Sequence, residues 1–110
     1  MKKFIEKSLD TDKAQDITSI ELAGKSSIAD YMIVASGTSQ KHIATLADHL
    51  IEKLHDKGFG HIPVEGKGDS DWVVLDVGNI IVHLFRPEMR QLYNLETMWG
   101  MPEVTLEAAL

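Results

Sequence analysis

The chain has 110 residues, 44% of them hydrophobic and 25% charged, a composition that predicts one globular domain with a core of its own. It contains no cysteine, which excludes disulfides, thiol catalysis and thiolate metal sites, and its formal net charge of −6 argues against broad electrostatic binding to nucleic acid. The first residues lack the apolar run of a signal peptide, and no stretch of the sequence approaches the length of a membrane span. We therefore expect a cytoplasmic protein that does not contact a membrane.

The first third of the chain predicts one short helix and two strands. Apolar residues at helical spacing indicate a helix over residues 2–12. Alternating side chains over Asp16–Leu22 predict a strand, and the continuous apolar run within Asp30–Ala35 is typical of a strand covered on both faces. Both strands are expected to belong to one mixed sheet with helices packed on it.

A longer helix follows the turn Gly37-Thr38-Ser39, where the apolar period changes and stays helical through about residue 57. Thr38 or Ser39 is the expected N-cap, and Gly58 is the expected stop. The apolar residues that fall on one stripe of this helix are Ile43, Leu46, Ala47, Leu50, Ile51 and Leu54. This stripe is expected to pack on one face of the sheet.

The stretch after residue 71 predicts an antiparallel hairpin, because two short apolar runs, Trp72–Val77 and Ile80–Phe85, are separated only by Gly78-Asn79. In that register Trp72 faces Phe85. One face, which we call the aliphatic face, carries Val73, Leu75, Val77, Ile80, Val82 and Leu84. The other, which we call the mixed face, carries Trp72, Val74, Asp76, Ile81, His83 and Phe85. We expect the aliphatic face to form core and the mixed face to carry function.

The remaining segments complete an α/β domain. Residues 58–65 predict a crossover with a short edge strand, and Pro87 suits the first turn of a final helix that can pack back on the sheet. The element order predicts a single domain over residues 1–99, with a mixed, mostly five-stranded sheet and flanking helices. Residues 100–110 are expected to form a loosely held tail.

Catalytic groups are scarce. The five histidines show no metal-ligand spacing, and Asp76 is the single carboxylate on the predicted hairpin strands, so a two-metal site lacks ligands. The Gly37-Thr38-Ser39 turn caps a helix and can also bind phosphate, which leaves a nucleotide-binding or nucleotidyltransferase-like enzyme using this turn and Asp76 as an alternative. We expect no metal, no cofactor and no sequence-specific nucleic-acid binding.

The mixed face has two interpretations that the pattern leaves open. Residues 65–110 hold three basic residues against eight acids, and they contain Trp72 and Phe85 together with Tyr93 and Trp99. Large aromatic groups with scattered acids are typical of a protein–protein interface. However, the C-terminal helix can equally cover Trp72 and Phe85, and His83 can equally be a hydrogen-bonded structural residue.

Three long stretches carry a family resemblance. DYMIVASGTSQKHIATLADHLIEKL at residues 30–54, DWVVLDVGNIIVHLF at 71–85 and RPEMRQLYNLETMW at 86–99 together resemble the ribosomal silencing factor family, the Iojap or RsfS-type proteins. The resemblance covers the chain from about Asp16 to Trp99. It implies a mixed α/β fold similar to a nucleotidyltransferase core without the catalytic acids, and a protein that is not an enzyme.

The resemblance also implies a partner. Family members bind the fourteenth protein of the large ribosomal subunit at the subunit-joining face, which blocks the small subunit and represses translation when nutrients are scarce. They are also seen as homodimers. For this chain we expect seven residues to contact the ribosomal protein: Asp71, Trp72, Asp76, His83, Phe85, Tyr93 and Glu96. Trp72 and Phe85 are expected as apolar anchors, His83 and Tyr93 as polar contacts, and the three acids as complements to basic groups.

Overall fold

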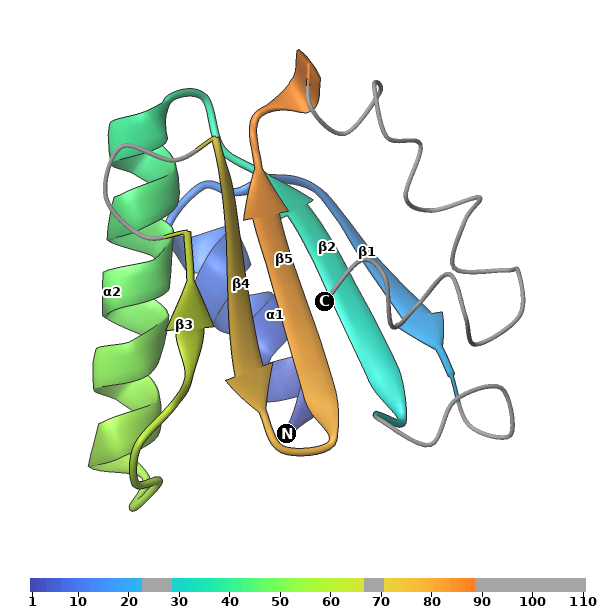
Figure 1. Cartoon of the computed structure of the whole chain (residues 1–110), viewed down its shortest axis with the longest axis vertical. Coiled ribbons are helices and arrows are strands. Elements are labelled where there is room, and N and C mark those ends of the chain that lie inside the picture. Colours follow the sequence, from blue (N-terminus) through green and yellow to red (C-terminus); the bar gives the residue numbers. More distant parts are fainter. Residues whose placement is uncertain (23–28, 67–70, 89–110) are drawn as a thin grey trace.

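The computed structural model describes residues 1–22, 29–66 and 71–88, which form two helices and five strands (Figure 1). The elements are α1 (Lys2–Thr11), β1 (Gln15–Glu21), β2 (Tyr31–Ser36), α2 (Gln40–Asp56), β3 (Val64–Glu65), β4 (Trp72–Val77) and β5 (Ile80–Phe85). The strands form one sheet in the order β1-β2-β5-β4-β3, in which only the β2–β5 pair is parallel. The predicted α/β class with a mixed five-stranded sheet is confirmed.

The long helix α2 begins and ends where its capping residues predict. Ser39 is the N-cap, and its side-chain oxygen accepts a hydrogen bond from the backbone N–H of His42 at 3.0 Å. Gly58 follows the helix with a φ of +95°, a left-handed conformation that glycine adopts without steric cost. Five apolar residues of the predicted stripe are buried, and Ile51 is partly buried.

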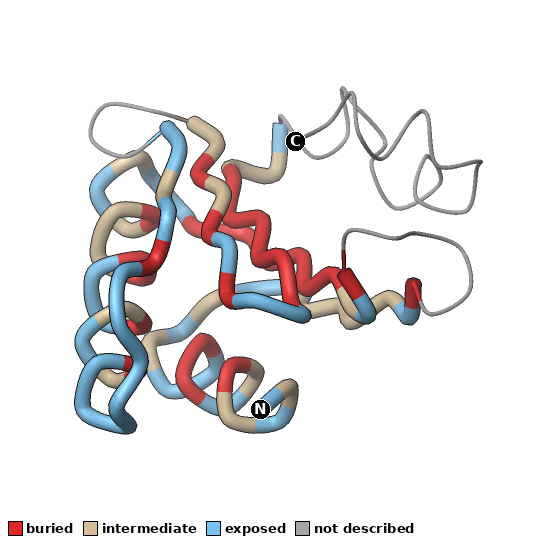
Figure 2. The backbone as a smooth tube through the Cα atoms, turned by 60° about the horizontal axis from the view of Figure 1, so that its bottom comes forward, coloured by how far each residue is buried: buried red, intermediate tan, exposed pale blue. Residues whose placement is uncertain are grey.

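The two helices lie on the same side of the sheet (Figure 2). Their apolar residues pack against the aliphatic face of the hairpin in one large cluster. The cluster combines Ile5, Leu9, Ile43, Leu46, Leu50 and Leu54 from the helices with Val73, Leu75, Val77, Ile80, Val82 and Leu84 from the hairpin. Burying each large aliphatic side chain contributes roughly 1.5–3 kcal/mol before conformational entropy opposes it. The aliphatic face is therefore core, as predicted.

The hairpin has the predicted register. Trp72 pairs with Phe85 and Val77 with Ile80, which leaves a two-residue turn. Gly78, the first turn residue, has a φ of +68°, which a side chain would strain. The carbonyl of Asn79 then accepts hydrogen bonds from the N–H groups of both Asp30 and Tyr31, at 2.8 and 3.2 Å, and so ties the turn to β2.

The end of the chain is described only in part. Pro87 and Glu88 adopt the helical conformation expected of a first turn. The rest of the predicted C-terminal helix and the predicted tail at residues 100–110 lie outside the described residues.

Candidate interaction surface

The mixed face of the hairpin lies on the side of the sheet opposite α1 and α2, because side chains alternate along each strand (Figure 2). Three residues of this face, Ile81, His83 and Phe85, are buried. Ile81 and Phe85 are only 2% and 1% exposed. They belong to a second apolar cluster whose members are Leu22, Ala29, Met32, Val34, Ile81 and Phe85, with Ile20, Trp72 and Val74 packed against it. The sheet therefore carries a core on both faces.

Three rings meet at one end of the mixed face. The ring centroid of Trp72 lies 5.8 Å from that of His83 and 5.9 Å from that of Phe85, the second pair at an interplanar angle of 60°. His83 and Phe85 complete the group with centroids 6.5 Å apart at 80°. Tilted and edge-on pairs at these distances are the favourable arrangement for aromatic rings. We call these three residues the aromatic cluster.

The aromatic cluster is fixed by a hydrogen bond. The indole Nε1–H of Trp72 donates to Nδ1 of His83 at 2.9 Å. Because an indole nitrogen can only donate, Nδ1 of His83 carries no proton and the neutral ring carries its proton on Nε2. His83 is fully buried, and this burial lowers the pKa of its imidazole from 6.5 to about 4. Of the two interpretations of His83, the structure supports the hydrogen-bonded structural residue.

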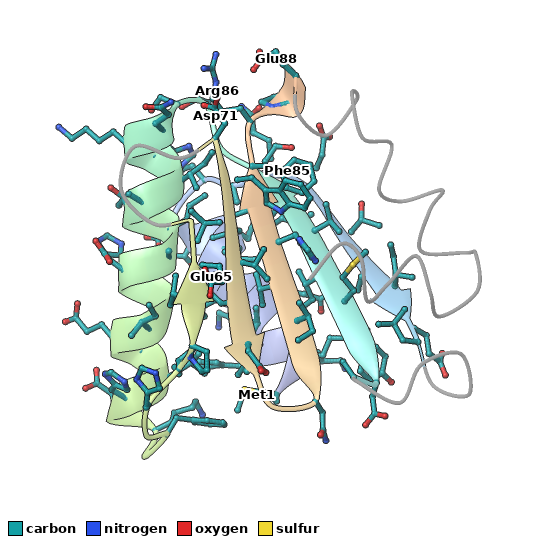
Figure 3. The ribbon with its side chains drawn as sticks, in the orientation of Figure 1. Met1, Glu65, Asp71, Phe85, Arg86 and Glu88 are labelled. Carbon is teal, nitrogen blue, oxygen red and sulfur yellow. The ribbon has the colours of Figure 1, made fainter. Side chains whose placement is uncertain are left out.

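Asp71 lies beside the aromatic cluster, at the end of the sheet where β4 begins and β5 ends (Figure 3). Its Oδ1 accepts a hydrogen bond from Nε2 of Gln40 at 3.0 Å and lies 3.4 Å from Nη1 of Arg86. Its carbonyl also accepts from the backbone N–H of Arg86 at 3.1 Å. Asp71 therefore joins β4, the residue after β5 and the first turn of α2, while its side chain stays 37% exposed.

Asp76 lies at the other end of β4. It is exposed, and its Oδ1 accepts a hydrogen bond from the backbone N–H of Gly78 at 3.1 Å. Gly37 lies at the opposite end of the sheet, where its N–H donates to the carbonyl of Phe85 at 3.2 Å. Asp76 lies four positions after Trp72, the partner of Phe85, which corresponds to roughly 13 Å along the strand. The structure thus keeps Asp76 apart from the turn that the enzyme alternative pairs with it.

The turn before α2 uses its own polar groups within the protein. Besides the bond from Gly37, the N–H of Thr38 donates to Nδ1 of His42 at 2.9 Å, and Ser39 caps the helix. A Cβ on Gly37 would lie 2.8 Å from Cγ1 of Ile43, so glycine is required here by close packing of the turn on the helix. Helix capping and packing account for this turn.

Two histidines of α2 contact the end of α1. His42 and His49 both reach Asp12 at the end of α1. Nε2 of His42 lies 3.0 Å from the Asp12 carbonyl, and Nδ1 of His49 lies 3.2 Å from its carboxylate. His55 and His61 line a cavity of about 480 Å³. In the part of the chain that the structure describes, no group of three or more His, Asp or Glu side chains is arranged to hold a metal ion.

The seven predicted contact residues fall into three groups. Trp72, Asp71 and Asp76 are at least partly exposed along β4 and its start, whereas His83 and Phe85 do not present their side chains to solvent. Tyr93 and Glu96 lie outside the described residues. The partners of Asp71, Gln40 and Arg86, could not be found from the sequence, because no local pattern signals contacts between residues 15 and 31 positions apart.

The fold and this surface define a small α/β domain with an aromatic cluster and two flanking acids on one hairpin. No helix within the three described ranges has the length and apolar character needed to cross a membrane. A family model described as "Ribosomal silencing factor during starvation" matches residues 1–109. The chain belongs to the ribosomal silencing factor family.

Relatives and a solved structure agree with this assignment. The chain is 50% identical over 99 residues to the ribosomal silencing factor RsfS of Zymomonas mobilis, covering 89% of this chain and 74% of that protein. It is 32% identical over 93 residues to mouse "Mitochondrial assembly of ribosomal large subunit protein 1", covering 82% of this chain and 41% of that protein. A crystal structure of a Chromobacterium violaceum protein superimposes with a TM-score of 0.86 at 30% identity, covering 93% of this chain and 85% of that one.

Proposed function

We propose that this protein binds the large ribosomal subunit in the cytoplasm through its fourteenth ribosomal protein and, without acting as an enzyme, blocks association with the small subunit. The family description names silencing of the ribosome during starvation, and the name of the mouse relative refers to the large subunit. Occupying the subunit-joining face would prevent joining by steric exclusion alone, and a factor of that kind needs a stable binding surface and no catalytic group.

The observation that carries this proposal is the fixed position of Trp72. Its side chain is partly exposed, its indole N–H is bound to His83, and its ring rests against the rings of His83 and Phe85. A large aromatic group held in one orientation loses little conformational entropy on binding, which is the property of an interface anchor. We assign Trp72 as the anchor, with the buried His83 and Phe85 as the residues that position it.

Charge along β4 suits a basic partner. Asp76 lies on the mixed face, and Asp71 lies five residues earlier, roughly 16 Å along the chain, just before the start of β4. Separated exposed carboxylates of this kind steer a basic protein surface and set its orientation more than they add affinity. Tyr93 and Glu96 remain proposed contacts on the strength of the family resemblance.

The test is a pull-down of ribosomal particles from cell extract with the tagged protein. We expect free large subunits to be enriched over joined ribosomes, and the isolated fourteenth ribosomal protein to be retained in a separate binding assay. A control variant is Lys41→Gln, which changes an exposed residue on α2 outside the mixed face and should leave this enrichment unchanged. Equal recovery of joined ribosomes and free large subunits would contradict the proposal.

A further inference from the structure

The helices α1 and α2 run antiparallel and contact each other along their lengths. Near the start of α1, Nζ of Lys57 lies 4.5 Å from the ring centroid of Phe4. One turn further, Nζ of Lys53 donates a hydrogen bond to Oγ of Ser8 at 3.1 Å, and it also lies 3.3 Å from the carboxylate of Asp12. A seam with several ammonium groups along it therefore runs between α1 and α2.

A cavity of about 370 Å³ opens on this seam, and its lining combines cationic, hydroxyl and aromatic groups. The lining residues are Phe4, Lys7, Ser8, Thr11 and Lys53. Sites for small molecules typically have volumes of roughly 300–1,000 Å³, and the volume of this cavity falls within that range. The lining offers hydrogen-bond donors for an anion in Lys7, Lys53 and Thr11, beside a larger apolar surface.

Much of the positive charge on the seam is not neutralised. The carboxylate of Asp12 is shared by Lys53 and His49 at the end of α1. Among the residues that the structure describes, neither Lys7 nor Lys57 forms an ion pair. Lys57 lies over the Phe4 ring, whereas Lys7 lines the cavity and has no ion pair among the described residues.

We propose that the seam between α1 and α2 binds a nucleotide or a similar small phosphate ester. The ammonium groups of Lys7 and Lys53 and the hydroxyl of Thr11, all of which line the cavity, bind phosphate oxygens through charge-assisted and ordinary hydrogen bonds. The ring of Phe4 offers an apolar surface to the base or another apolar part of the ligand. This site lies on the helix side of the sheet, so a partner on the mixed face leaves it accessible (Figure 2).

The proposal is tested by calorimetric titration of the intact protein with ADP, inorganic phosphate and adenosine, each without added metal. We expect ADP to bind with measurable heat, phosphate to bind more weakly, and adenosine to bind at least tenfold more weakly than ADP. Absence of heat with millimolar ADP overturns the proposal. Equal binding of ADP and adenosine overturns it too, because the lysines would then contribute nothing.

Three variants decide whether ADP occupies this seam. Lys7→Gln is expected to weaken ADP binding about tenfold, the effect of losing one charge-assisted hydrogen bond. Lys41→Gln, an exposed lysine on α2 that does not line the cavity, and Asp76→Asn are expected to leave it unchanged. Equal weakening by Lys7→Gln and Lys41→Gln indicates diffuse electrostatics and overturns the proposal. Weakening by Asp76→Asn alone places the ligand at the hairpin and also overturns it.

Discussion

The indole nitrogen of Trp72 donates a hydrogen bond of 2.9 Å to the imidazole of His83 on the neighbouring strand. The two residues are diagonal neighbours, since His83 pairs directly with Val74, and this is the distance over which long side chains meet across a sheet. One ring is buried and the other partly exposed. The pair thus connects the core of the second sheet face with the surface that we propose binds the ribosome.

Replacing His83 with phenylalanine removes the acceptor but keeps a buried ring. We expect the free energy of unfolding to fall by about 1–3 kcal/mol, because the indole N–H of Trp72 then lacks this partner. Urea denaturation measures the loss, and tryptophan fluorescence reports a changed environment for Trp72. His83→Gln, whose amide oxygen can accept the bond, is the matched control and should lose less. Unchanged stability of His83→Phe would show that the bond contributes nothing.

His83 also makes stability depend on pH. In the unfolded chain its imidazole takes a proton near pH 6.5, whereas burial holds the pKa in the folded protein at about 4. Acid therefore favours the unfolded chain: the contribution of His83 is complete above pH 6.5 and is lost progressively down to about pH 4. The expected loss is about 3 kcal/mol over that window.

This dependence is measured as the difference between the wild type and His83→Gln in urea denaturation at several pH values. The difference cancels the titration of the other four histidines. It should be constant above pH 6.5 and change between pH 6.5 and 4. A difference that stays constant over the whole range would contradict the buried neutral imidazole.

Gly37 is expected to tolerate no side chain. A Cβ at this position would meet Cγ1 of Ile43 at 2.8 Å and its backbone nitrogen at 3.2 Å, so Gly37→Ala forces the turn away from α2. We expect a loss of about 1–3 kcal/mol, measured as a lower midpoint of thermal unfolding. Gly60→Ala is the control, because a Cβ there meets nothing within 4 Å. Equal midpoints for the two variants would argue against close packing at Gly37.

A substitution at Asp71 is expected to change the association rate with the large subunit but hardly the free energy of unfolding. Its ion pair with Arg86 is more than a third exposed on both sides, so Asp71→Asn should change the free energy of unfolding by less than about 1 kcal/mol. If Asp71 steers a basic partner, the same variant should slow association with the large subunit, and added salt should reduce the difference from the wild type. Stopped-flow association at two salt concentrations measures this. An association rate equal to that of the wild type at low salt would remove Asp71 from the proposed surface.

Local sequence patterns were enough to predict the hairpin register and the start of α2. The register of the hairpin follows from two alternating runs and the turn at Gly78-Asn79, and the start of α2 follows from the capping preference of Ser39. The parallel pairing of β2 with β5 joins residues about 50 positions apart, and no local signal marks it. That pairing places Met32 and Val34 next to the mixed face.

The candidate site was predicted less completely for the same reason. Alternation identified which side chains share the mixed face, but burial of His83 and Phe85 depends on neighbouring strands that alternation does not specify. The contacts of Asp71 with Gln40 and Arg86 likewise depend on three segments meeting at one end of the sheet. Sequence pattern gave the residue types of the surface, and tertiary packing decided which of them are exposed.

Subunit joining measured by light scattering tests the central claim most directly. Purified large and small subunits are mixed after the large subunits have been incubated with increasing amounts of the protein. We expect the wild type to suppress joining, and folded Trp72→Ala to need roughly 30- to 1000-fold more protein, the effect of losing an aromatic anchor of ~2–4 kcal/mol. Joining at the full rate in the presence of saturating wild-type protein would contradict the proposed function.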